Sequence, residues 1–356
     1  MSVANWVQDR HPTDRVHLDA AAAGRVSSRV LELQAEHLEA EAVRGAYVAE
    51  AEAAEAIDAG RAALGALVGL DTAFYTDGAA TSFSVLLDAW PLSRGARIGT
   101  VKGEYGGNAR VLRDRAALRG WDLVFLETDE LGRILDVPGD LDLVTFPQVL
   151  SQRGVAQPVS RVLATGVPLL LDVAQAAGQT EVPPGAAAYV GTSRKWLCGP
   201  RGVGWGAVSP GLALGDPPTL GTANFPGDVR RFDTTEPHVA GRVGLAHAVR
   251  GWSPALLPVV QAGASAARVL LEGAGGWSVV EPVDEPTGIT TLTHPSADPW
   301  AVRAALVEQG FVVSVVPTTR ADDMTVPVLR VSTAAWVTPG DLEALAAALH
   351  SLGSSA

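Results

Sequence analysis

The sequence contains little cysteine. Cys198 is the single cysteine among 356 residues, which excludes an intramolecular disulfide framework and favours a reducing compartment. The N-terminal segment, MSVANWVQDRHPTDR, lacks the apolar stretch of a secretory signal. No uninterrupted apolar run reaches membrane-spanning length, because the candidate LLPVVQAGASAARVLL is interrupted by small and polar residues. We therefore expect a soluble, cytoplasmic protein.

The chain also lacks an excess of basic residues. Its formal net charge of −12 at pH 7 argues against nucleic acid and anionic membranes as partners. Hydrophobic residues make up 47% of the chain and charged residues 19%, so a sizeable buried core is expected. A chain of this length usually forms more than one domain. We expect an N-terminal arm over residues 1–15, a large domain over 16–245 and a small C-terminal α+β domain over 246–356.

The middle of the chain alternates between short strand-like runs and helix-like or glycine-rich segments. Helices are expected over residues 82–89 and 108–118. This alternation predicts an α/β sheet with helices on both faces. The strand-like runs read FYT, RIGTV, DLVFLE, LDLVTF, VPLLLD, AAYVGTS and GVGWGAV.

The flanking regions are expected to differ from this pattern. One long helix is predicted from Ser27 or Ser28 to about Leu67. A Pro- and Gly-rich loop over 210–228 precedes a helical region over 238–272. The C-terminal part combines strand-like runs (GITTLTH, FVVSVV and VLRVST) with two helices that begin at prolines.

Lysine is also scarce. Only Lys102 and Lys195 are lysines, so chemistry that requires an amine has two candidates. Lys195 follows a predicted strand and precedes a glycine-rich turn. Formation of a Schiff base needs a neutral amine, and the neighbouring Arg194 together with burial would lower the pKa of Lys195. The alternative is an ordinary surface lysine.

A carboxylate, Asp172, closes the apolar run VPLLLD. Such a group is costly to bury unless a cation or hydrogen bonds compensate its charge. A protonated pyridine nitrogen is one such cation, because a carboxylate beside it keeps the ring a strong electron acceptor. The alternative is a carboxylate that caps a helix or a turn.

Taken together, these motifs resemble those of class V aminotransferases, which are fold-type I enzymes that depend on pyridoxal 5′-phosphate (PLP). The resemblance rests on Asp172-x-x-Gln175, Thr192-x-Arg194-Lys195 and the turn Gly199-Pro200-x-Gly202-x-Gly204. It implies a large α/β/α domain with a mixed, mostly parallel sheet, and a smaller C-terminal α+β domain. It also implies PLP as the cofactor, an amino-acid substrate and a homodimer with shared active sites. No metal site is predicted.

The resemblance assigns roles to the residues of these motifs. Asp172 pairs with the pyridine nitrogen, and Gln175 donates a hydrogen bond to the phenolic oxygen of the ring. Lys195 forms the Schiff base and then moves the Cα proton. Thr192 and Arg194 face the phosphate, although the family usually has histidine where this chain has Arg194.

Further cofactor contacts follow from the same resemblance. Gly78, Ala79 and Ala80 begin a helix whose backbone N–H groups would bind the phosphate. Tyr105 would stack on the pyridine ring, where relatives commonly have histidine; the alternative is a loop tyrosine. Thr234 or Thr235 would reach the partner subunit's phosphate, although the family's threonine register falls on Glu236 instead.

Substrate contacts are expected from the C-terminal part. Arg330 lies in a Leu-Arg-x-Ser strand. By resemblance, its planar guanidinium group binds the substrate α-carboxylate through two hydrogen bonds. The alternative is an arginine that faces solvent. A trimethylammonium group on the substrate would need an aromatic or acidic wall. The candidates for that wall are Tyr47, Trp196, Trp205, Phe225 and Glu236.

The absence of a loop cysteine argues against one reaction of the family, that of the cysteine desulfurases. Cysteine desulfurases need a cysteine on the loop before the Leu-Arg-x-Ser strand, and here that loop reads SVVPTTRADDMTVP. Cys198 is expected to pack as a small buried group. Three segments, RGAYVAEAEAAEAIDAGR, YVGTSRKWLCGPRGVGW and HVAGRVGLAHAV, resemble the carbon–sulfur lyases of ergothioneine biosynthesis.

That resemblance implies β-elimination from a cysteine-conjugate sulfoxide, hercynylcysteine sulfoxide. The products would be a sulfenate or thiol (ergothioneine), pyruvate and ammonia. The alternatives within the family are an aminotransferase, a cysteine desulfurase-like lyase and an isopenicillin-N-epimerase-like protein. An alternative of a different class is a catalytically inactive binding protein with the same fold.

Overall fold

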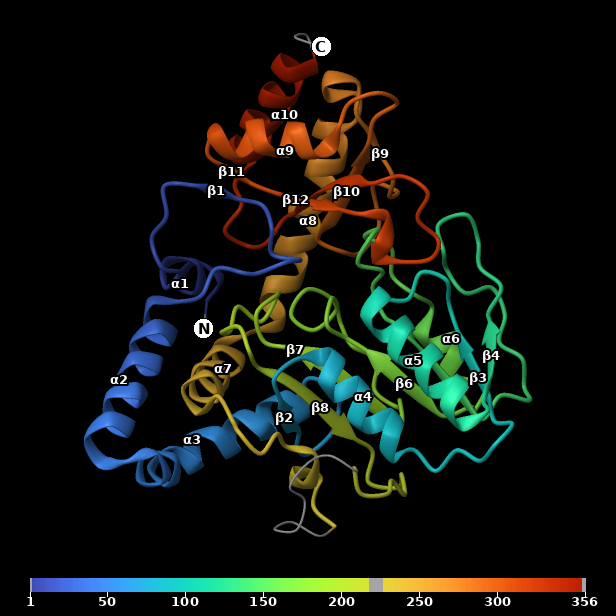
Figure 1. Ribbon diagram of the computed structural model, residues 1–356. Helices are drawn as coiled ribbons and strands as arrows, with labels where there is room; N and C mark the ends of the chain where they lie inside the picture. Colours follow the sequence, from blue (N-terminus) through green and yellow to red (C-terminus); the bar gives the residue numbers. More distant parts are fainter. Residues whose placement is uncertain (1, 218–226, 354–356) are drawn as a thin grey trace.

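A mixed sheet forms the centre of the larger part of the molecule (Figure 1). The computed structural model describes residues 2–217 and 227–353. Within them the strand order is β2-β8-β7-β6-β5-β3-β4, and β8 runs antiparallel to both of its neighbours while the other pairs are parallel. The strands are β2 (Phe74–Thr76), β3 (Arg97–Thr100), β4 (Asp122–Phe125), β5 (Leu143–Pro147), β6 (Leu169–Asp172), β7 (Ala188–Thr192) and β8 (Gly204–Val208).

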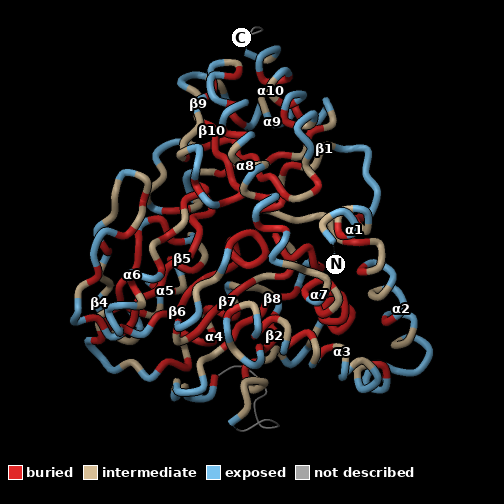
Figure 2. Tube along the Cα trace, turned by 180° about the vertical axis from the view of Figure 1, so that it is seen from behind, coloured by how far each residue is buried: buried red, intermediate tan, exposed pale blue. Residues whose placement is uncertain are grey.

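Helices cover both faces of this sheet because its central strands are apolar on both sides. In β6, Leu170 packs toward α4 and α5, whereas Leu169 and Leu171 belong to the core shared with α3, α6 and α7. Figure 2 shows buried residues concentrated in the central strands and exposed ones on the outer helices. The helices of this part are α1 (Val3–Gln8), α2 (Ser28–Arg44), α3 (Ala46–Ala66), α4 (Ala79–Ala89), α5 (Gly106–Arg119), α6 (Val159–Leu163), η2 (Val229–Phe232) and α7 (Val239–Gly251).

A second, smaller sheet lies above the first in Figure 1. Its order is β12-β13-β10-β9, and all its pairs are antiparallel. A short parallel pair, β1 with β11, lies beside it. The elements are β1 (Val16–His17), η3 (Pro254–Leu256), α8 (Leu257–Leu271), η4 (Ala274–Gly276), β9 (Ser278–Val279), β10 (Ile289–Thr293), α9 (Pro299–Glu308), β11 (Phe311–Val312), β12 (Ser314–Val316), η5 (Thr318–Arg320), β13 (Val328–Ser332) and α10 (Pro339–Gly353).

The predicted architecture is confirmed: a helix-covered, mostly parallel sheet is followed by a smaller α+β unit. The domain limits at 15/16 and 245/246 stay a prediction. The structure adds that Val16 and His17 pair with Phe311 and Val312, so this N-terminal strand lies with the C-terminal unit.

Three predicted elements are divided in the structure. The long helix from Ser27 or Ser28 to Leu67 is two helices, because Gly45 adopts φ 91° between them, a conformation that favours glycine. The helical region over 238–272 is interrupted between α7 and η3. The run FVVSVV supplies both β11 and β12, which belong to different sheets. Each prediction was too long because local periodicity does not show where a chain turns.

One helical stretch, Pro254–Leu271, is long and apolar enough to cross a membrane by length and composition alone, with 39% of it buried. It packs against β10 and α10 in the smaller unit. Arg268, in its last turns, is buried and donates hydrogen bonds to the carbonyl oxygens of Val283, Glu285, Thr287 and Ile289. These contacts are those of a helix in a protein core.

Candidate active site

A cavity of about 280 Å³ opens at the carboxyl ends of β6 and β7. Side chains that follow adjacent parallel strands meet at this edge, which is where α/β sheets bind ligands. The cavity joins residues more than a hundred positions apart in the sequence. It is lined by Asp77, Gly78, Ala79, Ala80, Tyr105, Asn108, Pro147, Val149, Ser151, Asp172, Ala174, Gln175, Thr192, Arg194, Lys195, Gly202 and Arg320.

Asp172 is the last residue of β6 and is buried. Its Oδ1 accepts a hydrogen bond from the Ala174 N–H at 2.7 Å, and its Oδ2 accepts one from the Asn108 Nδ2 at 2.7 Å. Burial raises the pKa of Asp172, and the charge of Lys195 opposes that rise. The two hydrogen bonds hold a carboxyl group at the cavity wall, where a cationic ring nitrogen would compensate its burial.

Lys195 follows β7 and lines the same cavity. Removal of water by the surrounding protein lowers the pKa of Lys195 to about 7, against the opposing effect of Asp172. The guanidinium groups of Arg194, Arg330 and Arg320 lower it further. The other lysine, Lys102, is exposed. The structure therefore provides a buried amine that is about half neutral near pH 7.

The lowered pKa of Lys195 predicts how covalent capture of an aldehyde depends on pH. A neutral amine attacks the carbonyl, so the capture rate should rise as pH rises through 7, by about tenfold between pH 6 and 8, and then level off. The measurement is the absorbance change of the cofactor-free protein mixed with pyridoxal, which has no phosphate to titrate. A rate that keeps rising to pH 10 would show an unperturbed lysine.

The turn Gly78-Ala79-Ala80 lies at the start of α4, where no side chain caps the helix. First-turn N–H groups lack partners within a helix and attract anions. Gly204 on β8 makes the turn possible, because a Cβ there would lie 2.2 Å from the Gly78 carbonyl carbon. The predicted phosphate site is thus the uncapped start of a helix, and it lines the cavity.

Three other predicted cofactor contacts line the cavity. Gln175 has both amide atoms engaged, since its Nε2 donates to the Ala21 carbonyl oxygen (3.0 Å) and its Oε1 accepts from the Trp196 indole (2.9 Å). Thr192 ends β7. Arg194 donates to the carbonyl oxygen of Ala22, and burial lowers its pKa. Their roles toward PLP remain predictions.

Tyr105 stands immediately before α5 and is 36% exposed, on the wall of the cavity. The guanidinium carbon of Arg320 lies 5.4 Å from the centre of its ring. Arg320 belongs to η5, on the loop where desulfurases need a cysteine. The loop is fixed to the larger part of the molecule by Asp322, whose N–H donates to the Lys102 carbonyl oxygen at 3.0 Å and whose carboxylate pairs with Arg113 at 2.6 Å.

Arg330 on β13 does not line the cavity surface but lies directly behind it. It is 3% exposed and donates to the carbonyl oxygen of the cavity residue Ser151 at 2.9 Å. It also donates to the Ser314 hydroxyl (3.4 Å) and lies 3.6 Å from the Asp19 carboxylate. Burial lowers the pKa of Arg330 to about 10. The alternative of a solvent-facing arginine is wrong.

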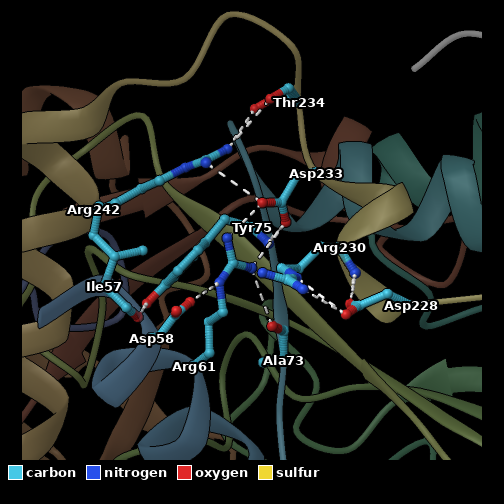
Figure 3. Close-up of polar contacts among 10 residues, drawn as sticks. All are labelled: Ile57, Asp58, Arg61, Ala73, Tyr75, Asp228, Arg230, Asp233, Thr234 and Arg242. Carbon is cyan, nitrogen blue, oxygen red and sulfur yellow. Dashed lines mark hydrogen bonds and ion pairs between the residues drawn. The ribbon is translucent and has the colours of Figure 1, made fainter. Parts of the chain in front are cut away.

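Tyr47 and Thr235 lie elsewhere on this subunit. Both line a separate cavity of about 830 Å³ between α3 and the segment before α7. Figure 3 shows the network beside it: Asp233 pairs with Arg61 (2.5 Å) and accepts the Tyr75 N–H (2.7 Å), while Arg242 donates to the Thr234 hydroxyl at 3.1 Å. Within one subunit neither residue joins the Lys195 cavity.

The other candidates for a substrate wall are also placed away from the cavity surface. Trp196 and Trp205 are buried at 3% and 0% exposure, and neither is a lining residue. Glu236 lines the cavity of Tyr47. Phe225 lies outside the described residues. Cys198 is buried, as predicted, and its pKa is raised to about 12 by burial.

Several polar residues of the site were given no role by the sequence, among them Glu104, Asn108, Ser151 and Arg320. Glu104 and Asn108 stand on either side of Tyr105, and Asn108 in the first turn of α5 donates a hydrogen bond to Glu104, which precedes the helix. Ser151 and Arg320 come from loops, and no local pattern distinguishes them.

The donor set fits PLP. The cavity combines a buried carboxyl group, a neutralisable amine and an uncapped helix start, which suit the ring nitrogen, the aldehyde and the phosphate of that cofactor respectively. Asp172, Lys195 and the Gly78–Ala80 turn would hold it. These groups lie on three different elements, so the fold itself brings them together.

Comparison with known proteins agrees with this fit. No protein-family model matches the chain. The chain is 38% identical to a protein of Mycobacterium tuberculosis (strain CDC 1551 / Oshkosh) named "Probable hercynylcysteine sulfoxide lyase", over 97% of this chain and 92% of that protein.

Solved structures share the fold at lower identity. An apo cysteine desulfurase from Thermococcus onnurineus NA1 has a TM-score of 0.88 and 18% identity, over 100% of this chain and 99% of that one. The cystine C–S lyase C-DES in complex with cysteine persulfide has a TM-score of 0.84 and 18% identity, over 95% and 98%. A C-DES variant with glycine linked covalently to its PLP has a TM-score of 0.84 and 17% identity, over 95% and 97%.

The site and the likenesses agree on the fold, the cofactor and the class of reaction. The buried carboxyl group, the amine of lowered pKa and the helix start match what a PLP enzyme requires, and the M. tuberculosis relative is similar over almost the whole chain. The chain belongs to the hercynylcysteine sulfoxide lyase family within the class V, fold-type I enzymes, and it is a PLP-dependent carbon–sulfur lyase.

Proposed function

We propose that this lyase cleaves the sulfoxide of a cysteine S-conjugate by β-elimination, with hercynylcysteine sulfoxide as the substrate. The observation that carries the proposal is the composition of the cavity. Among its described lining residues Lys195 is the one amine, Arg320 occupies the loop that bears cysteine in desulfurases, and no cysteine is present. The name of the M. tuberculosis relative supports the same substrate.

Lys195 is the proposed acid–base residue. Its neutral amine would accept the substrate Cα proton, which is feasible near neutral pH because its pKa is about 7. PLP, when bound, supplies a ring that accepts the negative charge left on Cα. Asp172, held by Asn108 and Ala174, would keep that ring cationic.

Arg320 is the proposed partner of the leaving group. Loss of the Cα proton allows the Cβ–S bond to break with its electron pair on sulfur, and the departing sulfenate carries negative charge on oxygen. A guanidinium aimed at that oxygen would stabilise the charge as it develops. Arg320 lines the cavity, and no side-chain hydrogen bond or ion pair engages it within the described residues.

The rest of the substrate leaves as a three-carbon enamine, which takes up water and releases pyruvate and ammonia. The sulfenate is two electrons more oxidised than the thiol, so an external thiol reductant must convert it to ergothioneine. No redox step is required of the protein.

We also propose that the enzyme is a cytoplasmic homodimer with shared active sites. Tyr47 and Thr235 lie outside the Lys195 cavity of their own subunit, and in a dimer they would act toward the partner's cavity. Thr235 is exposed, and the neighbouring Asp233–Arg61 pair fixes the segment that presents it. Sedimentation should therefore give twice the chain mass.

Product analysis tests the reaction. With a cysteine S-conjugate sulfoxide we expect equimolar pyruvate and ammonia, and with the matching thioether a rate lower by about a hundredfold, because a thiolate leaving group gains less from Arg320. A keto acid that forms only when an amino acceptor is added would show an aminotransferase. Alanine and persulfide would show a desulfurase, and failure to gain visible absorbance with PLP would show a binding protein.

Arg330 is the predicted ligand of the substrate α-carboxylate. Replacing Arg330 with alanine should raise KM by about a hundredfold, since a bidentate charged contact is lost, while the visible absorbance of bound PLP is unchanged. Steady-state kinetics and absorbance spectra measure the two effects. Loss of PLP from the variant would instead mean that Arg330, through Asp19 and Ser151, holds the site together.

A further inference from the structure

A second buried carboxyl group, that of Glu104, lies one hydrogen-bonded step behind Asp172. The two amide hydrogens of Asn108 Nδ2 are divided between them, one toward Asp172 Oδ2 at 2.7 Å and one toward Glu104 Oε1 at 3.3 Å. Glu104 Oε1 also accepts the N–H of Tyr105 at 2.7 Å. The bridge fixes the orientation of Asn108, since a flipped amide would turn its oxygen toward both carboxyl groups.

Within the part of the chain that the structure describes, no positively charged group pairs with Glu104. The residue is 1% exposed, its Oε2 has no hydrogen-bond partner among the described residues, and none of the ion pairs found there includes it. Lys195 faces Asp172 instead, and Lys102 is exposed. Burial, followed by the charge of Asp172, raises the pKa of Glu104 to about 8. Two anions in one buried network would repel each other, so the single charge belongs on Asp172.

We propose that Glu104 is a positioning residue: as a neutral acid it anchors Asn108, and Asn108 in turn holds the Asp172 carboxylate toward the cofactor's ring nitrogen. The inference rests on the assignment of Asp172 to that nitrogen but not on the identity of the sulfur substrate. Glu104 itself touches neither the cavity surface nor the substrate, so it acts through Asn108.

The first test measures equilibrium PLP binding at pH 7 by absorbance. Glu104→Gln keeps a neutral group with a carbonyl oxygen that can accept both hydrogen bonds, so its Kd should stay within about threefold of the wild type. Glu104→Ala and Asn108→Ala should each weaken binding by about tenfold. The double variant should be no weaker than Asn108→Ala, because both changes break one chain of contacts.

Two outcomes of this test would overturn the proposal. If Glu104→Gln binds PLP as weakly as Glu104→Ala, a negative charge is needed and Glu104 is not neutral. If the double variant shows the full sum of both losses, Glu104 does not act through Asn108. Glu281→Gln is the matched control, since Glu281 is also buried with a raised pKa but lies outside the cavity lining. It should bind PLP like the wild type.

The second test measures the protonation state of Glu104 in the cofactor-free protein. An infrared difference spectrum between the wild type and Glu104→Gln should show the carbonyl band of a protonated carboxylic acid at pH 7. The band should vanish as pH rises through about 8. If the band is absent at pH 7, Glu104 is ionised and the proposal is wrong, even when every variant folds. Thermal unfolding of each variant shows whether its folding is intact. The infrared result does not depend on which sulfur substrate the enzyme cleaves. The proposed substrate can therefore be wrong while this inference is right, and the reverse.

Discussion

Replacing Lys195 with alanine is expected to lower turnover by a factor of about 10⁴ or more, because one change removes both the covalent anchor of the cofactor and the base for the Cα proton. The geometry argues for this residue over Lys102. Lys195 lines the cavity together with Asp172, and its pKa is lowered to about 7. Lys102 is exposed and follows β3 on a different loop. Steady-state release of pyruvate measures the loss.

Borohydride trapping provides the complementary measurement. Reduction of the PLP-loaded wild type followed by peptide mapping should give one adduct, on the peptide that contains Lys195, and Lys195→Ala should give none. Lys102→Ala is the matched control and should retain both adduct and turnover. An adduct on Lys102 would show that the central assignment is mistaken.

The sequence predicted the main features of the site because the informative residues lie close together in the chain. Asp172 to Gly204 span β6, β7 and β8, so three adjacent strands bring the carboxyl group, the amine and the glycine turn to one edge. The short strands were also predictable, because each is a buried apolar run between glycines, prolines or polar residues.

The remaining site residues could not be predicted because their positions depend on contacts across the fold. Arg320 reaches the cavity only because the loop after β12 docks on the larger part of the molecule through Asp322 and Lys102. Arg330 was predicted from its strand motif, but its contact with the Ser151 carbonyl, 179 positions away in sequence, was not. The burial of Glu104 likewise depends on how α5 packs, and hydrophobic periodicity carries no information about it.

The separation of Tyr47 and Thr235 from Lys195 would be explained by the proposed dimer. Residues that complete a site across a subunit interface have no reason to lie near it within one chain. Their shared cavity is lined by the Asp233–Arg61 pair and by Arg242, which are polar groups suited to a polar interface. In one chain, Tyr47 and Thr235 line a cavity of their own. The proposed dimer would bring them to the cofactor of the partner.

Replacing Asp172 with asparagine is expected to lower kcat by about 10³-fold while leaving PLP attached to Lys195. Asparagine has nearly the same shape and can still accept the Ala174 N–H, although its amide nitrogen would then face Asn108 Nδ2 and that hydrogen bond would be lost. Asparagine cannot hold a ring nitrogen in its cationic form, so charge on Cα is less stabilised. Loss of the carboxylate also removes the effect that raises the pKa of Lys195. The pH midpoint for capture of pyridoxal should therefore shift below 7.

The matched control for this charge change is Asp77→Asn. Asp77 lines the same cavity but is exposed and lies beyond the end of β2, so its loss should alter kcat by less than about threefold. The shift in capture midpoint separates electrostatics from misfolding, because a disordered cavity would admit water and raise the pKa of Lys195 toward its ordinary value. A midpoint that moves upward in Asp172→Asn, or a kcat equal to that of the wild type, would show that Asp172 is a structural cap and not the partner of the ring nitrogen.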